Sequence, residues 1–495
     1  MDARQRTHVR RFAVVAALAL PLSLLSACAV GPNYKRPLID APAMTRGQVE
    51  PAEAESLADL PWWQVFGDPA LHGLITSAIR NNYDLATAAA RVEQARQLVG
   101  VARADMFPQI GYQGSAGRGS SFAPPGPNAT FNSFLGAFNL AWEIDIWGRI
   151  RRATESARAE YYGAEDFRRG VLLTLVSSVA QAYFELLELD RELEIARLTT
   201  KTFQDTFDLF ARRYEGGVGT LLEVSRAEGA LAQAAATIPD FERLIVIKEN
   251  QLSILLGRDP GEIPRGAALA AQTTPPAVPP GLPSQLLERR PDVRQAEQAV
   301  VAANANVGVA TANFFPRLGL TSLYGGQSSE IESIVKGTGS IWAIAGSLAG
   351  PIFQGGRLLS SYKATKAVWE QATQQYEQTA INAFAEVSGT LVSRDKLKAI
   401  RTEKERQVKA LQKSVALSLD RYDEGIATYY EVLEAQQQLF PAQLDLARTT
   451  RDQLSVVVLL YRALGGGWNL EVPQWAPGEP AAPHQSTPTT QRTNP

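Results

Sequence analysis

Residues 99–108 read VGVARADMFP, and residues 307–316 read VGVATANFFP. The two stretches lie 208 positions apart, and each joins an apolar run with helical spacing to a Phe-Pro pair. Because proline disfavours the helical conformation in the residue before it, each stretch predicts the end of a helix. The same structural boundary therefore occurs twice in the chain.

The offset of 208 residues relates the rest of the two halves without a gap. The paired Gly-Arg steps, Arg-Tyr-x-x-Gly turns and Leu-Gly ends that match are Gly148, Arg149, Arg213, Tyr214, Gly217, Thr220, Glu223, Leu256 and Gly257, with Gly356, Arg357, Arg421, Tyr422, Gly425, Thr428, Glu431, Leu464 and Gly465. A gapless match of this length indicates that one structural unit was duplicated. It predicts internal pseudo-symmetry, which is typical of walls, rings and arrays built from equivalent pieces.

Each repeat is predicted to contain a helix, a β-hairpin and two long helices. The Ala-rich segment 82–105 has apolar residues at helical spacing. No proline occurs from Gly148 to Tyr214, nor in its copy from Arg357 to Tyr422. At ~1.5 Å per residue, each of these segments predicts a helix on the order of 100 Å long. With return helices at 221–256 and 429–464, the pattern favours coiled-coil-like tubes or stalks.

The turns between the long helices carry recognisable end signals. Gly217 and Gly425 suit a helix C-terminus, which often needs a positive φ. Thr220 and Thr428 then fit the N-cap position of the return helices. Glu223 and Glu431, three residues on, are predicted to complete capping boxes.

The predicted hairpins, 107–146 and 315–353, have one apolar and one wet face, and predicted loops at 117–130 and 325–340 join their strands. In residues 134–146, Phe138, Leu140, Trp142 and Ile144 alternate with residues that include Asn139, Glu143 and Asp145. This pattern fits a transmembrane β-barrel with its apolar side outward, in which Glu143 and Asp145 face the lumen. The alternative is a soluble hairpin packed on a core, with both acidic groups solvated. Two hairpins cannot close a barrel, so the membrane interpretation requires an oligomer; three copies would supply twelve strands.

The N-terminus is predicted to be a targeting signal. A basic start and an apolar run are followed by Leu25-Ser26-Ala27-Cys28, which resembles a bacterial lipoprotein signal with an acylated Cys28. Ala29, rather than Asp, implies sorting to the outer membrane in such lipoproteins. The alternative is an ordinary signal peptide with an incidental cysteine. Cys28 is the only cysteine of the chain, which excludes a disulfide framework.

Composition excludes several function classes. Lys and Arg together number 49 and Asp and Glu 51, so nothing favours nucleic acid. Only three histidines are present, too few and too scattered for a metal site or a catalytic triad. No P-loop, GxGxxG, GxSxG or HExxH motif occurs, so the sequence predicts neither a cofactor nor an enzyme.

The lipoprotein signal, the two Phe-Pro strand starts, the Trp147-Gly148-Arg149 and Gly355-Gly356-Arg357 steps and the Arg-Tyr-x-x-Gly turns together resemble the TolC-like outer-membrane efflux channels, in their OprM-type (NodT) lipoprotein branch. The resemblance runs from Gly31 to about Leu470. It implies an α+β homotrimer with a twelve-strand outer-membrane barrel, a periplasmic helical barrel and an equatorial collar. It also implies a passive exit duct for drugs or other toxic small molecules. The partners that it implies are a periplasmic adaptor and an inner-membrane pump of the RND type.

On this basis the chain is divided into six parts. They are the signal peptide 1–27, the anchor and equatorial segment 28–81, repeat 1 at 82–257, a Pro-rich linker at 258–289, repeat 2 at 290–465, and a C-terminal equatorial segment and tail at 466–495.

In the family the tunnel closes at the helix turns, through a tyrosine contact between hairpins and an acidic ring. The resemblance places Tyr422 at the latch tyrosine, Glu223 at its partner, and Glu431 and Glu434 in the ring. Ala427 departs from the best-known member, which has a latch arginine there, so closure would depend on fewer polar bonds. From the residues alone, Glu431 is equally a helix cap and Tyr422 a packing residue.

Two other functions are compatible with parts of the pattern. A type I protein-secretion channel would use the same fold with another pump, although the lipoprotein signal favours drug or metal efflux. A trimeric stalk or adhesin without a pore is opposed by the polar strand face, because a filled stalk needs no wet lumen.

Overall fold

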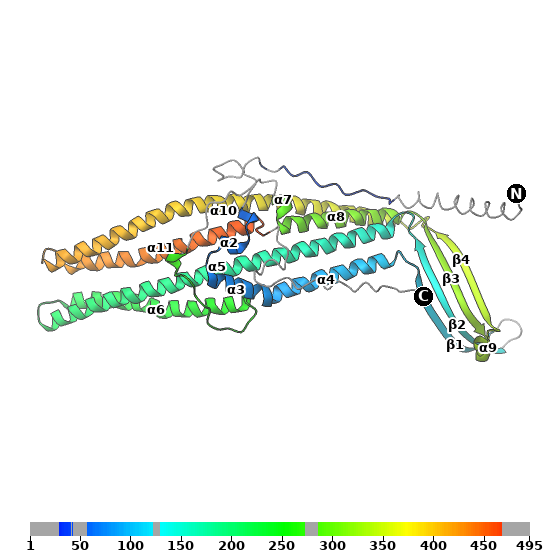
Figure 1. Cartoon of the computed structure of the whole chain (residues 1–495), viewed down its shortest axis with the longest axis horizontal. Helices are drawn as coiled ribbons and strands as arrows, with labels where there is room; N and C mark the ends of the chain where they lie inside the picture. The colour runs from blue at the N-terminus through cyan, green and yellow to red at the C-terminus, as the bar shows by residue number, and fades with distance from the viewer. Residues whose placement is uncertain (1–28, 41, 43–56, 122–128, 273–285, 468–495) are drawn as a thin grey trace, which may run out of the picture. The chain divides into compact units, whose positions relative to one another are not determined.

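The computed structural model describes residues 29–40, 42, 57–121, 129–272 and 286–467 (Figure 1). The signal segment 1–27, Cys28 and residues 468–495 lie outside this part, and the predictions on them stay predictions. The described residues form two compact units. The first contains 29–38, 90–121, 129–165 and 295–378, and the second contains 39, 40, 42, 57–89, 166–272, 286–294 and 379–467.

The first unit holds a four-stranded antiparallel sheet in the order β1-β2-β3-β4 (Figure 1). Its strands are β1 (Gln109–Ser121), β2 (Ala129–Ile144), β3 (Arg317–Ser328) and β4 (Ser340–Ala349). Both predicted hairpins are therefore confirmed, and they join through β2 and β3. β1 and β4 are the edge strands of the sheet, and each has one side that no other described strand pairs with.

The register of the sheet gathers aromatic side chains into one row. Tyr112 pairs with Phe138, Phe138 with Tyr324, and Tyr324 with Trp342. Directly paired residues point to the same face of a sheet, so the four rings share a face. All four are exposed, and Trp342 keeps 75% of its surface accessible. The next row on this face contains Ile110, Leu140, Ser322 and Ile344.

The strand ends differ from the prediction. β1 extends through Ser121 and β3 through Ser328, into segments predicted as loops, because ladder hydrogen bonds need no apolar side chains. The second of these predicted loops, 325–340, also contains the short helix α9 (Ile331–Val335). In contrast, β2 ends at Ile144, two residues before the predicted end.

Asp145 therefore lies one residue beyond the end of β2. Its Oδ2 atom accepts a hydrogen bond from the backbone N–H of Arg151 at 2.9 Å. Arg151 lies in the first turn of α5 (Arg149–Glu215), where backbone N–H groups have no partner within the helix. The Asp145 carboxylate is thus used at this helix start, and the placement of Asp145 beside Glu143 in the barrel lumen stays a prediction.

The predicted long helices are confirmed. α5 is followed by α6 (Leu221–Leu255), and α10 (Arg357–Asp423) by α11 (Tyr429–Ala463). The shorter helices that precede the strands are α4 (Tyr83–Ala104) and α8 (Pro291–Ala312). Among the described residues, α5 alone has a stretch apolar enough to cross a membrane, but 67% of that stretch is buried inside the protein. This burial is typical of a core helix.

The repeat extends to contacts that its sequence does not reveal. The side-chain amide of Asn82 donates to the carbonyl of Leu255 at 3.0 Å, at the end of α6. The guanidinium of Arg290 donates to the carbonyl of Ala463 at 2.8 Å, at the end of α11. Both donors and both acceptors are 208 residues apart. Two different side chains thus donate hydrogen bonds to the terminal carbonyl groups of equivalent helices.

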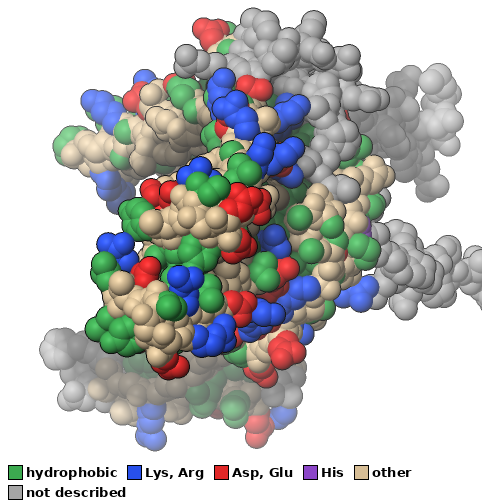
Figure 2. Space-filling model, turned by 90° about the vertical axis from the view of Figure 1, so that its left-hand side faces the viewer, with side chains coloured by type: hydrophobic (Ala, Val, Ile, Leu, Met, Phe, Trp, Pro, Cys, Tyr) green, Lys and Arg blue, Asp and Glu red, His purple; other side chains and the backbone are tan. Residues whose placement is uncertain are grey.

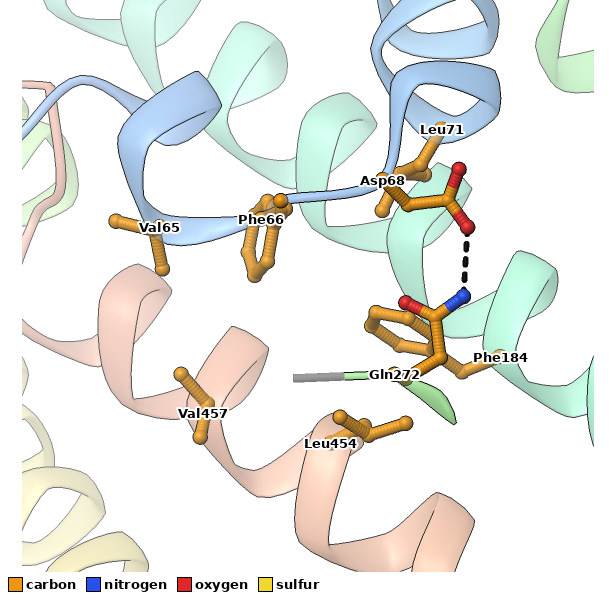
Figure 3. A pocket seen from close by; sticks show the side chains of 9 residues that line it. Val65, Phe66, Asp68, Leu71, Phe184, Gln272, Leu454 and Val457 are labelled. Atoms are coloured by element: carbon orange, nitrogen blue, oxygen red, sulfur yellow. Dashed lines mark hydrogen bonds between the residues drawn. The ribbon is translucent and has the colours of Figure 1, made fainter. Parts of the chain in front are cut away.

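The core of the second unit forms where an N-terminal segment packs on the long helices. This segment contains η1 (Leu57–Asp59), α2 (Trp62–Val65) and α3 (Pro69–Asn81). Trp62, Tyr183 and Tyr461 are fully buried in it. Residues from α2, α5 and α11 line one apolar pocket (Figure 3).

Asp68 is the polar centre beside that pocket (Figure 3). Its carboxylate accepts hydrogen bonds from the Tyr183 hydroxyl at 2.8 Å, the Gln272 amide at 2.6 Å and the Ala70 N–H at 2.8 Å. Burial by itself raises the pKa of Asp68, but these hydrogen bonds outweigh it and hold the pKa below the usual value. Asp68 thereby joins α3, α5 and the segment after α6.

A candidate gate at the helix turns

The turns at the ends of α5 and α10 have the same backbone geometry. Gly217 and Gly425 adopt φ values of 71° and 74°, in the left-handed region that favours glycine. In the first turn the N–H of Val218 bonds to the carbonyl of Arg213 at 2.9 Å. In the second, the N–H of Ile426 bonds to the carbonyl of Arg421, also at 2.9 Å. The prediction of glycine-ended helices is confirmed in both repeats.

The caps of the two return helices differ. At α6 the capping box is complete, since Glu223 accepts from the Thr220 N–H at 2.8 Å and Thr220 accepts from the Glu223 N–H at 3.3 Å. At α11, Thr428 makes no side-chain capping bond. Glu431 instead lies 3.5 Å from Arg421 in an ion pair. The second predicted capping box is wrong, because this carboxylate pairs with a guanidinium of its own hairpin.

Tyr422 has a different partner from the one expected. Its hydroxyl accepts a hydrogen bond from the Arg213 guanidinium at 3.0 Å, which links α10 to α5. Glu223 is held by Thr220, three residues away on its own helix. In the described part of the chain, the expected Tyr422–Glu223 hydrogen bond is not formed. The structure thus brings Tyr422 to the other hairpin but engages Glu223 elsewhere.

Tyr429 makes a buried contact with α5 that was not predicted from the sequence. Only 7% of its surface is exposed, and its ring lies edge-on to Phe210 with 4.4 Å between centroids. Its hydroxyl is 2.6 Å from the Thr206 hydroxyl, deep between α11 and α5. Burial raises its pKa above the usual tyrosine value. The signal that could have found it is a difference between the repeats, because the matching residue is Leu221.

Glu431 and Glu434 lie on the side of α11 that faces away from this contact. Both are exposed, whereas Val432 and Leu433 between them are buried. The Glu434 carboxylate accepts a hydrogen bond from Gln438 on the same helix at 3.3 Å. Figure 2 views the molecule from the side that is left in Figure 1, and it shows acidic, basic and hydrophobic side chains exposed together on that side.

Glu143 lies on the wet face of β2, close to the start of α5. Its two carboxylate oxygens accept from Arg149 at 2.8 and 2.9 Å, which makes a bidentate pair. Arg317, at the start of β3, comes within 4.0 Å of the same carboxylate. Glu143 is thus a paired group at the base of the sheet.

The polar face at this end of the sheet borders an open hollow of about 390 Å³ that Glu143, Arg149, Arg317 and Thr321 help to line. In the described residues, no group of three or more His, Cys, Asp or Glu side chains is placed to hold a metal ion. The lining of this hollow combines charged and hydroxyl groups with apolar side chains such as Trp142 and Leu320.

The chain matches the family model described as "outer membrane efflux protein" over residues 74–258 and 282–466. It is 34% identical to the toluene efflux pump outer membrane protein TtgC of Pseudomonas putida, over 91% of this chain and 95% of the relative. It is 31% identical to the probable outer membrane lipoprotein SilC of Salmonella typhimurium, over 90% and 97%.

A solved structure shares the fold. The open state of the MtrE outer membrane channel of Neisseria gonorrhoeae gives a TM-score of 0.81 at 27% identity, over 89% of this chain and 99% of MtrE. The two matched segments of the family model also begin 208 residues apart, as the sequence repeat does. With its tandem repeat, four-stranded sheet and paired helical hairpins, this chain belongs to the outer membrane efflux protein family.

Proposed function

We propose that three copies of this chain form the outer-membrane exit duct of a tripartite efflux system. The duct conducts drugs or other toxic small molecules passively from the periplasm to the exterior. The observation that carries this proposal is the sheet. It has an exposed aromatic and aliphatic face and a face with small and polar residues, and its edges at β1 and β4 are unpaired in the part of the chain that the structure describes.

Closure of the sheet follows from the physics of the membrane. No water is available in the hydrocarbon to bond the free N–H and C=O groups of an edge strand. Joining β4 of one copy to β1 of the next removes every edge when three four-stranded sheets form a ring. The exposed row that contains Trp342 then faces lipid, and the row that contains Asn139 faces the lumen. An acylated Cys28 would add a lipid anchor to the barrel.

The partner proteins would supply the energy for transport and select the substrate. The duct itself takes no cofactor and performs no chemistry. A periplasmic adaptor and an inner-membrane pump, of the RND type, would deliver the solute to the helix turns. A type I protein-secretion channel stays the alternative, with the same duct and a different pump.

The assembly is tested with the full chain purified from the outer membrane. Native mass spectrometry is expected to give a trimer, and planar bilayers to give discrete K⁺ conductance steps. Deletion of the gene is expected to increase sensitivity to toxic compounds, with rescue by the chain on a plasmid. A non-conducting monomer whose loss changes no sensitivity would overturn the proposal.

We further propose that Glu431 and Glu434 form the acidic ring of the gate. Three copies would bring six carboxylates to one constriction, and like charges crowded in a pore concentrate cations and repel anions. Glu431→Ala with Glu434→Ala is expected to lower the K⁺/Cl⁻ permeability ratio and to relieve block by multivalent cations. Reversal potentials in a KCl gradient measure the ratio.

A matched control for the ring lies in repeat 1. Glu223 is the counterpart of Glu431 and is held in a capping box. Glu223→Ala removes the hydrogen bond to the Thr220 N–H and is therefore expected to lower stability by about 1 kcal/mol and to leave selectivity unchanged. An equal loss of selectivity in both variants would show that the ring is not specific to α11.

A further inference from the structure

The apolar face of the sheet has a gap near the end of the strands that is farthest from α5 and α8 (Figure 1). One row across the four strands, which we call the glycine row, contains Gly114, Gly136, Gly326 and Ser340. Gly326 lies two residues beyond Tyr324 of the aromatic row, and residues two apart on a strand point to the same face. Three of the four positions in the glycine row therefore place no side chain on the apolar face.

The short helix α9 covers this gap. It lies against β3 and β2. A Cβ atom at Gly326 would come within 3.0 Å of the Cγ2 atom of Ile334, so Ile334 lies directly over this glycine. Gly326 is buried, although Tyr324 on the same strand and face keeps 66% of its surface exposed. The connection between β3 and β4 therefore folds over the apolar face of the sheet and not over the polar one.

Hydrogen bonds within the connection hold α9 in this place. The carbonyl of Ser333 accepts from the Gly339 N–H and from the Thr338 hydroxyl, both at 3.2 Å. The carbonyl of Gly339 accepts from the Gln327 N–H at 2.8 Å, one residue from Gly326 on β3. α9 is thus tied through its own loop to the strand that it covers.

The surface of α9 divides into an apolar side and a charged side. Ile331 and Ile334 are three residues apart, which places them on one side of the helix. Glu332 and Lys336 are four residues apart on the other side, and they form an ion pair at 2.8 Å. Ile331 keeps 61% of its surface exposed. The apolar side of α9 therefore extends beyond its contact with the sheet.

The position of α9 along the strands indicates what covers Ile331, a step that rests on the proposed function. The aromatic row that contains Tyr324 then faces lipid. Arg118 pairs with Asn132 on the same face, four residues beyond the glycine row, or about 14 Å at 3.4 Å per residue. α9 thus lies between the aromatic row and the first charged row, where hydrocarbon gives way to headgroups. Amphipathic helices lie at this boundary with the apolar side toward the acyl chains.

We propose that α9 is a lipid-contacting helix of the outer leaflet. Ile334 fills the glycine row, Ile331 enters the acyl chains at the boundary, and the Glu332–Lys336 pair stays among headgroups and water. Three copies would place three such helices around the outside of the barrel exit. Because α9 lies on the lipid-facing side of the sheet, it leaves the lumen uncovered.

The test compares cysteines at two adjacent positions of α9 in the full chain, inserted in the outer membrane. Ile331 and Glu332 are both exposed in the chain, so Ile331→Cys and Glu332→Cys would react alike if α9 lay in water. Each variant is labelled with a lipid-soluble maleimide and with a membrane-impermeant one. The wild-type chain, in which Cys28 is the only cysteine, gives the background. The ratio of lipid-phase to aqueous labelling is expected to be at least fivefold higher for Ile331→Cys, and equal ratios would overturn the inference.

A matched pair of glycine variants tests where α9 is seated. Gly326→Val forces a side chain against Ile334, whereas a Cβ atom at Gly136, the paired glycine on β2, meets no atom within 4 Å. In the Ile331→Cys background, Gly326→Val is expected to lower the labelling ratio to that of Glu332→Cys, and Gly136→Val to leave it unchanged. An unchanged ratio in Gly326→Val, or an equal fall in both variants, would overturn the assignment of Gly326 as the seat of α9.

Trp342→Cys separates this inference from the proposed barrel. Trp342 belongs to the aromatic row and keeps 75% of its surface exposed, so Trp342→Cys is expected to react with the lipid-soluble reagent. Lipid-phase labelling of Trp342→Cys without that of Ile331→Cys would overturn the role of α9 alone. Absence of lipid-phase labelling at both positions would count against the barrel itself.

Discussion

Leu140→Arg is expected to destabilise the membrane-inserted protein by about 2–4 kcal/mol per copy, the cost of a cation on the lipid face of a barrel near the bilayer midplane. Leu140 pairs with Ile110 on one side and Ser322 on the other, in the row next to the exposed aromatic one. Three copies carry the substitution at once, so the assembled barrel bears the cost three times. Insertion into the outer membrane is expected to fail or to give protein that unfolds at lower denaturant concentration.

Asn139→Arg is the matched control, one residue away on the opposite face. Asn139 pairs with Gly111 and Leu323, in the row assigned to the lumen. A cation there stays in water, so the variant is expected to insert normally. Urea titration of the folded barrel in lipid vesicles, followed by tryptophan fluorescence, compares the two variants. Equal stability of both, or greater damage from Asn139→Arg, would show that the faces are assigned the wrong way round.

The fold could be predicted because two strong signals agree. Period-2 alternation identifies β2 through Phe138, Leu140 and Trp142, and the absence of proline identifies α5 and α10. The repeat then carries each assignment to the other half of the chain. The strand ends were less predictable, because Gly- and Ser-rich residues such as those before Ser121 pair through backbone groups that leave no side-chain pattern.

The contacts of the candidate gate could be predicted only in part. Local signals sufficed for the Thr220–Glu223 capping box, since both partners lie within one turn. The Arg213–Tyr422 bond joins residues 209 apart, and no sequence pattern states which donor reaches the hydroxyl. The buried contact of Tyr429 could not be predicted from the repeat, because its counterpart is Leu221 and the two repeats share no residue at this position.

The sequence repeat does not show which side chains hydrogen-bond the carbonyl groups at equivalent helix ends. Asn82 and Arg290 both bond the last carbonyls of a return helix, yet an amide and a guanidinium share no sequence signature. Duplication preserved the backbone requirement, and the side chain that meets it changed.

The second large effect, on stability as a function of pH, is expected at a buried cluster of charged side chains in the second unit. Glu188 and Glu192 lie one turn apart on α5 and are 7% and 2% exposed. Arg451 approaches Glu188 at 3.4 Å, and Arg448 approaches Glu192 at 2.8 Å, both from α11. Burial raises the pKa of Glu188 from 4.5 to about 7, and the arginines offset only part of this shift. Glu192 shifts upward for the same reason.

The sign of the pH dependence follows from linkage. Between pH 4.5 and about 7 the folded protein holds a proton on Glu188 that the unfolded chain has released. The stability contributed by that proton is fully present near pH 4.5 and is lost as the pH rises to about 7. A shift of this size corresponds to about 3 kcal/mol per copy, at roughly 1.4 kcal/mol per pH unit. The ionised form of Glu188 is therefore the less stable form of the folded protein.

Glu188→Gln is expected to raise the free energy of unfolding at pH 8 by up to about 3 kcal/mol and to leave it nearly unchanged at pH 5, because glutamine resembles the protonated acid. Glu194→Gln, at an exposed ion pair with Arg191, is expected to change stability by less than about 0.5 kcal/mol at either pH. Denaturant unfolding of the purified full chain at the two pH values measures both variants. Destabilisation by Glu188→Gln at pH 8 would mean that Arg451 and Arg448 stabilise the carboxylate by more than burial costs, and that α5 and α11 are held together by the ionised pair.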